Sequence, residues 1–387
     1  MRLTRRLSLV LGLTQLIAWG TTFYLPAVIL GVVTRDLGGS RTATVGALSW
    51  ALIVAGTCAP RIGRWIDRRG GRGVLATSAV ILAAGLGLLA AARGLSMWYV
   101  GWTVLGVGMA LGLYDAAFAT VGRLLGVGAG PVITGITLVA GFSSTVFWPS
   151  STALVHLFGW RATLAIYAGV LLTVNLPVIL WLVPKAGPMP PTPARARSGP
   201  GGRRRLTALT CLSGFFTLRW LITTAIAVYV LQLFHGLGLS RGHAVMAAAL
   251  IGPGQVLGRV VDWSLDRRWR VLTRARLAAA LMPLAVAVLV LGGPASVAVF
   301  AVLYGMSNGI LSINRGTLPM AIFGPAGYAA LLGWLAVPPL LAQAAAPSLG
   351  AAVVAALPAL GVFLVAGGLG AVCFGLLLPL RIREVGP

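Results

Sequence analysis

Three ionisable side chains, Asp115, Arg219 and Arg315, lie inside long apolar segments of the sequence. A charged group at that depth in a bilayer costs at least about 2.5–3.5 kcal/mol, so each is expected to face a cavity or a partner. The planar guanidinium of Arg donates in pairs to carboxylate and other oxyanion groups. Two Arg against one Asp leave the expected cavity positively charged, which favours an anionic or polar solute over a lipophilic cation.

Asp115 and Arg315 are related by an internal alignment of the chain. The run GMALGLYD at 108–115 matches GMSNGILS at 305–312, so Ser312 takes the position equivalent to Asp115, and Arg315 follows about one turn later. Three interpretations stay open. The two side chains pair when the cavity is empty, or Asp115 carries a proton, or the pair is structural and never meets solute.

Polar and aromatic side chains in related segments complete the candidate solute site. Gln15 and Trp19 lie four residues apart and share one face of a helix. Tyr114 lies in the segment of the acidic residue, and Asn308 and Asn314 lie in the segment of the second Arg. Each of these side chains alone more often packs or hydrogen bonds to another helix than binds a ligand.

Composition places these residues in a membrane protein. Only 9% of the residues are charged, 58% are hydrophobic and the mean hydropathy is +0.94, whereas a soluble domain carries roughly 25% charged residues. We expect an all-α membrane protein with twelve transmembrane helices, each near or above the ~20 residues that a span needs. The twelve apolar segments are 7–33, 43–62, 73–92, 96–122, 131–157, 161–183, 206–235, 243–262, 275–293, 295–320, 327–350 and 353–380.

Basic residues predict the orientation of these spans. The segment 184–205 is rich in Pro, Gly and Arg, which is typical of a flexible linker between two bundles. With both termini in the cytoplasm, 23 of the 30 basic residues lie on the inner side and 5 on the outer side. Because cytoplasmic loops carry the excess of Lys and Arg, this split indicates an N-in, C-in topology. The net charge of +24 is thereby assigned to topology and anionic lipid rather than to nucleic acid.

A charged motif occurs twice, each time after the second apolar segment of its half. GRWIDRRGGR at 63–72 is followed 195 residues later by GRVVDWSLDRR at 258–268. A motif repeated at about half the chain length is typical of a duplicated membrane protein. With the twelve spans and the basic central loop, these copies resemble the Gly-x-x-x-Asp-Arg-x-Gly-x-Arg signature of the major facilitator superfamily. The matching residues are Gly63, Asp67, Arg68, Gly70 and Arg72, with Gly258 and Asp262 in the weaker second copy.

The resemblance covers essentially the whole chain and implies a bacterial-type secondary transporter in the plasma (inner) membrane. It implies two pseudo-symmetric six-helix bundles, here 1–183 and 206–387, around a cavity lined by spans one, four, seven and ten. Transport would proceed by rocking of the bundles about a midplane site, in a monomer without cofactor. The signature implies a gate in which Asp67 pairs with Arg groups or a helix N-terminus of the opposite bundle. Asp262 is a second candidate for that role, and topology alone is the alternative for Arg68.

Two functions stay open. The first is transport of a small anionic or polar solute, with proton coupling through Asp115. The alternative is efflux of drugs or toxic compounds, including metalloids bound by thiolates such as Cys58 and Cys211. Many drug/proton antiporters carry Arg where Trp102 stands and a Gly-Pro motif that 141–151 lacks, which disfavours efflux. A non-transporting sensor would not need three charges on cavity helices. No phosphate-binding loop, metal-ligand cluster or nucleophile arrangement points to an enzyme, a metal site or a primary pump.

Overall fold

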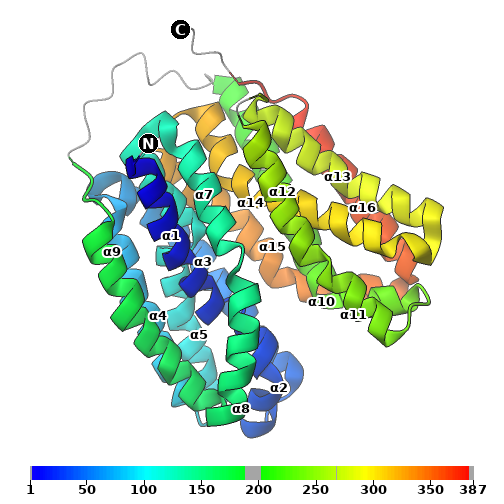
Figure 1. Ribbon diagram of the computed structural model, residues 1–387, viewed down its shortest axis with the longest axis horizontal. Coiled ribbons are helices and arrows are strands. Elements are labelled where there is room, and N and C mark those ends of the chain that lie inside the picture. The colour runs from blue at the N-terminus through cyan, green and yellow to red at the C-terminus, as the bar shows by residue number, and fades with distance from the viewer. Residues whose placement is uncertain (1, 188–201, 267, 383–387) are drawn as a thin grey trace. The chain divides into compact units, whose positions relative to one another are not determined.

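The computed structural model of the chain describes residues 2–187, 202–266 and 268–382, which form helices joined by short turns, with no strand among them (Figure 1). This part of the chain contains nine apolar helical runs long enough to cross a membrane. Two runs far exceed one crossing: Leu95–Leu182 has 88 residues and Val271–Phe323 has 53, whereas about 20 residues span the hydrocarbon core.

Glycines with positive φ divide these two long runs. Gly126 (φ 55°) and Gly159 (φ 80°) separate the first run into three helical segments, and Gly293 (φ 58°) separates the second into two. Glycine adopts such backbone angles readily because it has no Cβ. The described residues therefore make twelve crossings, which confirms the predicted all-α fold of twelve transmembrane helices.

The chain divides into two compact units. Unit 1 is Met1–Pro193 with Pro325–Ala344, and unit 2 is Ala194–Gly324 with Ala345–Pro387. One helix, α15 (Tyr328–Ala356), therefore contributes its first part to unit 1 and its last part to unit 2.

The predicted boundaries of the two bundles, 1–183 and 206–387, stay a prediction. Most of the predicted linker, 184–205, lies outside the described residues.

Aromatic side chains pack at the core of unit 1. Trp98 contacts both Trp102 and Trp160 edge to face, with ring centroids 5.9 and 6.1 Å apart, and all three are at most 4% exposed.

Besides the start of α15, the elements of unit 1 are α1 (Arg2–Thr21), α2 (Pro26–Asp36), α3 (Arg41–Arg69), α4 (Gly71–Ala90), α5 (Leu95–Gly112), α6 (Tyr114–Leu125), η1 (Gly126–Ala129), α7 (Gly130–Ala140), α8 (Ser143–Val170), η2 (Leu171–Asn175) and α9 (Leu176–Leu182).

The Gly-Trp-Arg run at 159–161 makes a compact turn on unit 1. Gly159 supplies the positive φ, and Trp160 then enters the aromatic core while its Nε1 donates to Asp36 (3.2 Å). Arg161 forms an ion pair with Asp36, donates to the carbonyl of Ala92 (2.9 Å) and lies 4.2 Å from the Trp160 ring centroid. The ion pair is more than 40% exposed on each side, so its net contribution to stability is small.

A second aromatic core lies in unit 2. Phe300 contacts Phe363 and Phe234 at centroid distances of 4.9 and 6.1 Å, and none of the three rings is exposed. The elements of this unit, besides the end of α15, are α10 (Gly202–Gly236), α11 (Arg241–Ala249), α12 (Ile251–Leu265), α13 (Val271–Gly292), η4 (Gly293–Ser296), α14 (Val297–Phe323) and α16 (Ala359–Leu377).

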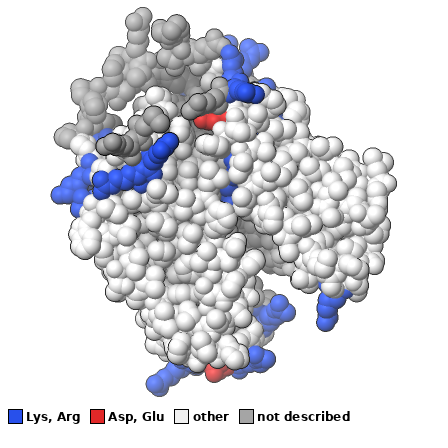
Figure 2. Space-filling model, in the orientation of Figure 1, with Lys and Arg blue, Asp and Glu red and all other residues white. Residues whose placement is uncertain are grey.

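Charged side chains gather near the ends of the helices. On the face drawn in Figure 2, blue and red residues lie at these ends, and the helix surfaces between them are almost uniformly uncharged. Such a distribution is expected of a multi-pass membrane protein, since the hydrocarbon core excludes charge.

Candidate functional site

A buried guanidinium lies between α10 and α14 in unit 2. Arg219 of α10 is 1% exposed, and its Nη2 donates to Ser307 Oγ and Asn308 Oδ1 of α14, both at 2.9 Å. Its Nη1 has no hydrogen-bond partner, and no carboxylate pairs with it, within the described parts of the chain. Arg219 is therefore a buried cation held by neutral acceptors, with one nitrogen left over to bind a further group.

The acceptors of Arg219 are held by their own hydrogen bonds. Asn308 Oδ1 also accepts from Thr223 Oγ1 (3.1 Å), one turn along α10 from Arg219. Ser307 Oγ donates to the carbonyl of Ala278 on α13. The Tyr304 hydroxyl donates to the carbonyl of Thr223 (3.4 Å). These bonds fix the polar groups around Arg219, and Asn308 is the most exposed of the two acceptors at 8%.

Arg315 and Asn314 lie further along α14. The Arg315 Cζ atom lies 5.2 Å from the ring centroid of Trp220, a cation–π contact with the residue that follows Arg219. Asn314 is 1% exposed, and its Nδ2 has no hydrogen-bond partner among the residues described. Unit 2 thus brings Arg219, Arg315 and Asn308 to the interface between α10 and α14.

A break in the helical backbone marks the polar region of unit 1. The predicted fourth span is one apolar run, but Leu113 is extended (φ −79°, ψ −171°) and separates α5 from α6. Gln15 Nε2 donates to the carbonyl of Gly112 at this break (2.6 Å), and Gln15 Oε1 is buried without a hydrogen-bond partner in the described structure. Asp115 lies in the first turn of α6, where the helix dipole favours a carboxylate.

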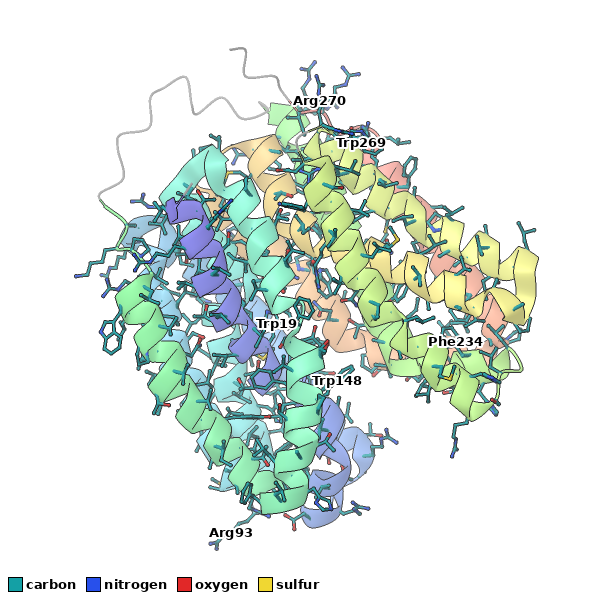
Figure 3. The ribbon with its side chains drawn as sticks, viewed as in Figure 1. Trp19, Arg93, Trp148, Phe234, Trp269 and Arg270 are labelled. Atoms are coloured by element: carbon teal, nitrogen blue, oxygen red, sulfur yellow. The ribbon has the colours of Figure 1, made fainter. Side chains whose placement is uncertain are left out.

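Aromatic rings surround this break. Trp19 contacts Tyr114 at a centroid distance of 4.9 Å, and its buried Nε1 has no hydrogen-bond partner among the described residues. Tyr24 contacts both Trp19 and Trp148, with ring centroids 6.1 Å apart in each case. Figure 3 shows Trp19 on α1 and Trp148 on the neighbouring α8. Unit 1 therefore brings Gln15, Trp19 and Tyr114 together, and the pairing of Asp115 with Arg315 stays a prediction.

The first copy of the charged motif lies against the amino end of α15. The two carboxylate oxygens of Asp67 accept from the backbone N–H groups of Ala329 (3.2 Å) and Ala330 (2.8 Å), so Asp67 caps that helix. Gly63 permits the close approach, because a Cβ there would lie 2.2 Å from the Ala329 carbonyl oxygen. Gly70 (φ 80°) ends α3.

The remaining basic residues of this copy have fewer contacts. Arg68 is exposed and Arg72 is half-buried. The basic contact near Asp67 comes instead from Arg123 of α6, whose Nε donates to the Asp67 carbonyl (3.3 Å) and whose Nη2 donates to the Gly187 carbonyl (2.9 Å).

The second copy makes a different contact. Asp262 is bound by Arg274 of α13 at 2.6 Å, and both side chains are almost completely buried. Arg274 also binds Asp266 at 2.5 Å. Asp262 therefore belongs to an ion-pair network within unit 2 and, unlike Asp67, caps none of the described helices. Gly258 packs against α14, since a Cβ there would lie 2.3 Å from the Met306 carbonyl oxygen.

A family model of the Major Facilitator Superfamily matches residues 10–337, the greater part of the chain. The chain belongs to this superfamily. No curated protein sequence matches it.

Solved structures of major facilitator transporters share the fold of this superfamily member. The human organic anion transporter MFSD10 (TETRAN) has a TM-score of 0.75 at 17% identity, covering 97% of this chain and 99% of the other. The proton:xylose symporter XylE, bound to 6-bromo-6-deoxy-D-glucose, has a TM-score of 0.70 at 15% identity, covering 96% and 94%. The E. coli fucose:proton symporter FucP has a TM-score of 0.70 at 15% identity, covering 96% and 97%.

This major facilitator protein also buries charges that its sequence did not single out. Arg259 is 6% exposed and Arg274 is 3% exposed, although the predicted topology explains both simply as basic residues near the inner side of the membrane. Ser307, which accepts from Arg219, was not a candidate either. One signal was present for Arg259, which is the second residue of the repeated Gly-Arg-x-x-Asp motif.

Proposed function

We propose that this chain is a secondary transporter of a small anionic or strongly polar solute, moved by alternating access. The observation that carries the proposal is the buried guanidinium of Arg219, which has neutral acceptors and an unpartnered Nη1. A buried ion without a counter-ion is expensive, and a solute carboxylate or oxyanion that accepts from Nη1 would compensate its charge. One protein of similar fold is described as an organic anion transporter, which agrees with this solute class.

Proton coupling through Asp115 is the second part of the proposal. Asp115 lies at the amino end of α6, beside the break at Leu113 and near the Gln15 and Trp19 side chains that touch the neighbouring residues. A carboxyl group at a discontinuous helix can hold or release a proton as solute arrives. Two proteins of similar fold are described as proton symporters.

Asp67 supplies the gate in this proposal. Its carboxylate binds two N–H groups at the amino end of α15, and these bonds must break if that end of the helix moves away from α3. Asp262 is proposed to support the gate indirectly, by fixing the end of α12 to α13 through Arg274. The proposed setting is the bacterial inner membrane, with a monomer whose termini both lie in the cytoplasm.

Efflux of metalloids would use the thiolates of Cys58 and Cys211, which are both partly buried free cysteines. The described residues contain no group of three His, Cys, Asp or Glu side chains that could hold a metal ion. Cys373 is buried, and its Sγ faces the carbonyl of Phe215 (3.9 Å). Drug efflux is the other form of this alternative, and it predicts binding of lipophilic cations.

A thermal-shift screen of the purified protein tests the solute class. Small carboxylates, phosphate and sulfate are compared with neutral sugars and lipophilic cations. We expect at least one anion to raise the melting temperature of the parent. Arg219→Gln should weaken the binding free energy of that anion by about 1.5–3 kcal/mol, the scale of a hydrogen bond to a charged group. Arg241→Gln, which changes an exposed basic residue of the same unit, is the matched control. Stabilisation by cations alone would favour the efflux alternative.

A further inference from the structure

A second buried guanidinium without a counter-ion lies in unit 2. Arg259 of α12 is 6% exposed, and its Nε donates to Ser312 Oγ of α14 (3.3 Å). Its Nη1 is buried and has no hydrogen-bond partner in the part of the chain that the structure describes. Arg259 thus repeats the arrangement of Arg219: a serine of α14 as neutral acceptor, and a free nitrogen.

The position of Arg259 follows from a close parallel crossing of α12 and α14. Gly254 and Gly258 of α12 meet Gly305 and Gly309 of α14, and a Cβ at any of the four would lie 2.1–2.7 Å from a backbone oxygen of the other helix. Small residues four apart allow such close contact of helix backbones. The crossing is built into the packing, so the next residue, Arg259, is held against α14.

The nearest acidic residue does not compensate Arg259. Asp262 lies three residues further along α12, but it is bound by Arg274 at 2.6 Å, and Arg259 forms no ion pair with a described carboxylate. Arg274 in turn binds both Asp262 and Asp266. Within the described residues, both carboxylates therefore form their ion pairs with Arg274 and none with Arg259.

Asn308 and Ser312 lie four residues apart on one face of α14, about 6 Å along the helix. Asn308 binds Arg219, and Ser312 binds Arg259. We propose that Arg259 and Ser312 form a second anion site, about one turn from the Arg219 site towards the carboxyl end of α14, and that a transported anion occupies the two sites in turn. This inference rests on the proposed function, because it names the path that the anion takes from the Arg219 site.

Two weak sites in series suit transport better than one strong site. A transported anion that is bound by one buried guanidinium must leave that guanidinium again. A second guanidinium nearby lowers the barrier to this step, because the anion does not have to enter the apolar interior alone. Ser307 and Asn308 hold Arg219, and Ser312 holds Arg259. These neutral oxygens do not cancel the charge of either guanidinium, so both remain available to an anion.

Thiol modification at Ser312 tests the second site without knowledge of the solute. In a background that carries Cys58→Ala, Cys211→Ala and Cys373→Ala, Ser312→Cys is reacted with the anionic sulfonatoethyl and the cationic trimethylammonioethyl methanethiosulfonates. We expect the anionic reagent to be favoured at least about tenfold over its preference at a free thiol, because a unit charge within a few ångströms acts in a partly desolvated site. Arg259→Gln should remove most of that preference.

The matched control is Ser264→Cys, an exposed position on the same helix α12. Its reagent preference should change less than about twofold when Arg259 is replaced. Arg259→Met is a second neutral variant, in case Arg259→Gln does not fold. A Ser312→Cys thiol that reacts with neither reagent, or a preference that survives loss of the Arg259 charge, would overturn the second site.

The two proposals fail separately. If Arg219→Gln binds anions as well as the parent, the proposed function is wrong, whatever happens at Ser312. If anion binding depends on Arg219 but Ser312→Cys shows no charge preference, only the second site is lost.

Discussion

Replacement of Arg219 by methionine should not destabilise the protein. Met has a side chain of comparable length without charge, and Arg219→Met removes no ion pair, because the described residues offer Arg219 no carboxylate. Its two acceptors keep other partners: Ser307 donates to Ala278, and Asn308 accepts from Thr223. A residue kept for binding rather than for folding should behave in this way.

The expected magnitude follows from the burial of the charge. Replacement of buried ionic groups by apolar residues of similar volume is often neutral or stabilising by about 1–4 kcal/mol, whereas removal of one partner of a buried pair costs about 3–5 kcal/mol. Arg274→Met provides the second case in the same unit, because it leaves Asp262 buried and unpaired. The two variants should therefore shift stability in opposite directions or differ by several kcal/mol.

The melting temperature of each purified variant is measured without solute. Unfolding is followed by the fluorescence of a dye that does not react with cysteine. We expect Arg219→Met to melt at or a few degrees above the parent, and Arg274→Met to melt clearly below it. A loss of stability in Arg219→Met as large as that in Arg274→Met would refute the argument, since Arg219 would then be a structural residue.

Three further outcomes are expected. Asp67→Asn weakens a charge-assisted helix cap by about 1.4 kcal/mol, so it should speed hydrogen exchange at the amino end of α15 by about tenfold. It should also impair transport at normal expression. Unchanged hydrogen exchange would argue against the gate. Gly258→Ala should lower stability by about 1–3 kcal/mol through overpacking against α14, while Gly252→Ala, which meets open space on the same helix, should be near neutral; equal melting temperatures would contradict the crossing. A single Cys in the predicted linker, 184–205, should resist impermeant labelling from outside intact cells, and ready labelling would reverse the topology.

The twelve spans could be predicted because apolar length and basic breaks are local properties of the sequence. The break at Leu113 could not be predicted, since 96–122 is one long apolar segment in which Asp115 is the only charge. The hydrogen bond from Gln15 to the Gly112 carbonyl depends on that break, so the partner of Gln15 could not be predicted either.

Motif positions were predictable, but their partners were not. The repeated Gly-Arg-x-x-Asp motif located Asp67 and Asp262 in equivalent loops, yet Asp67 caps a helix and Asp262 binds Arg274. The burial of Arg259 could not be predicted, because it depends on the glycine crossing of α12 and α14, a contact between segments about 50 residues apart.

Solute counterflow in liposomes tests directly whether Arg219 binds a transported anion. Vesicles that contain the purified parent are loaded with the anion that gives the largest thermal shift, and uptake of the same labelled anion is followed for the parent, Arg219→Gln and the control Arg241→Gln. We expect rapid exchange in the parent and in Arg241→Gln, and a loss of at least about tenfold in Arg219→Gln at low solute concentration. Exchange that is undiminished in Arg219→Gln, or exchange of lipophilic cations but of no anion in the parent, would contradict this expectation.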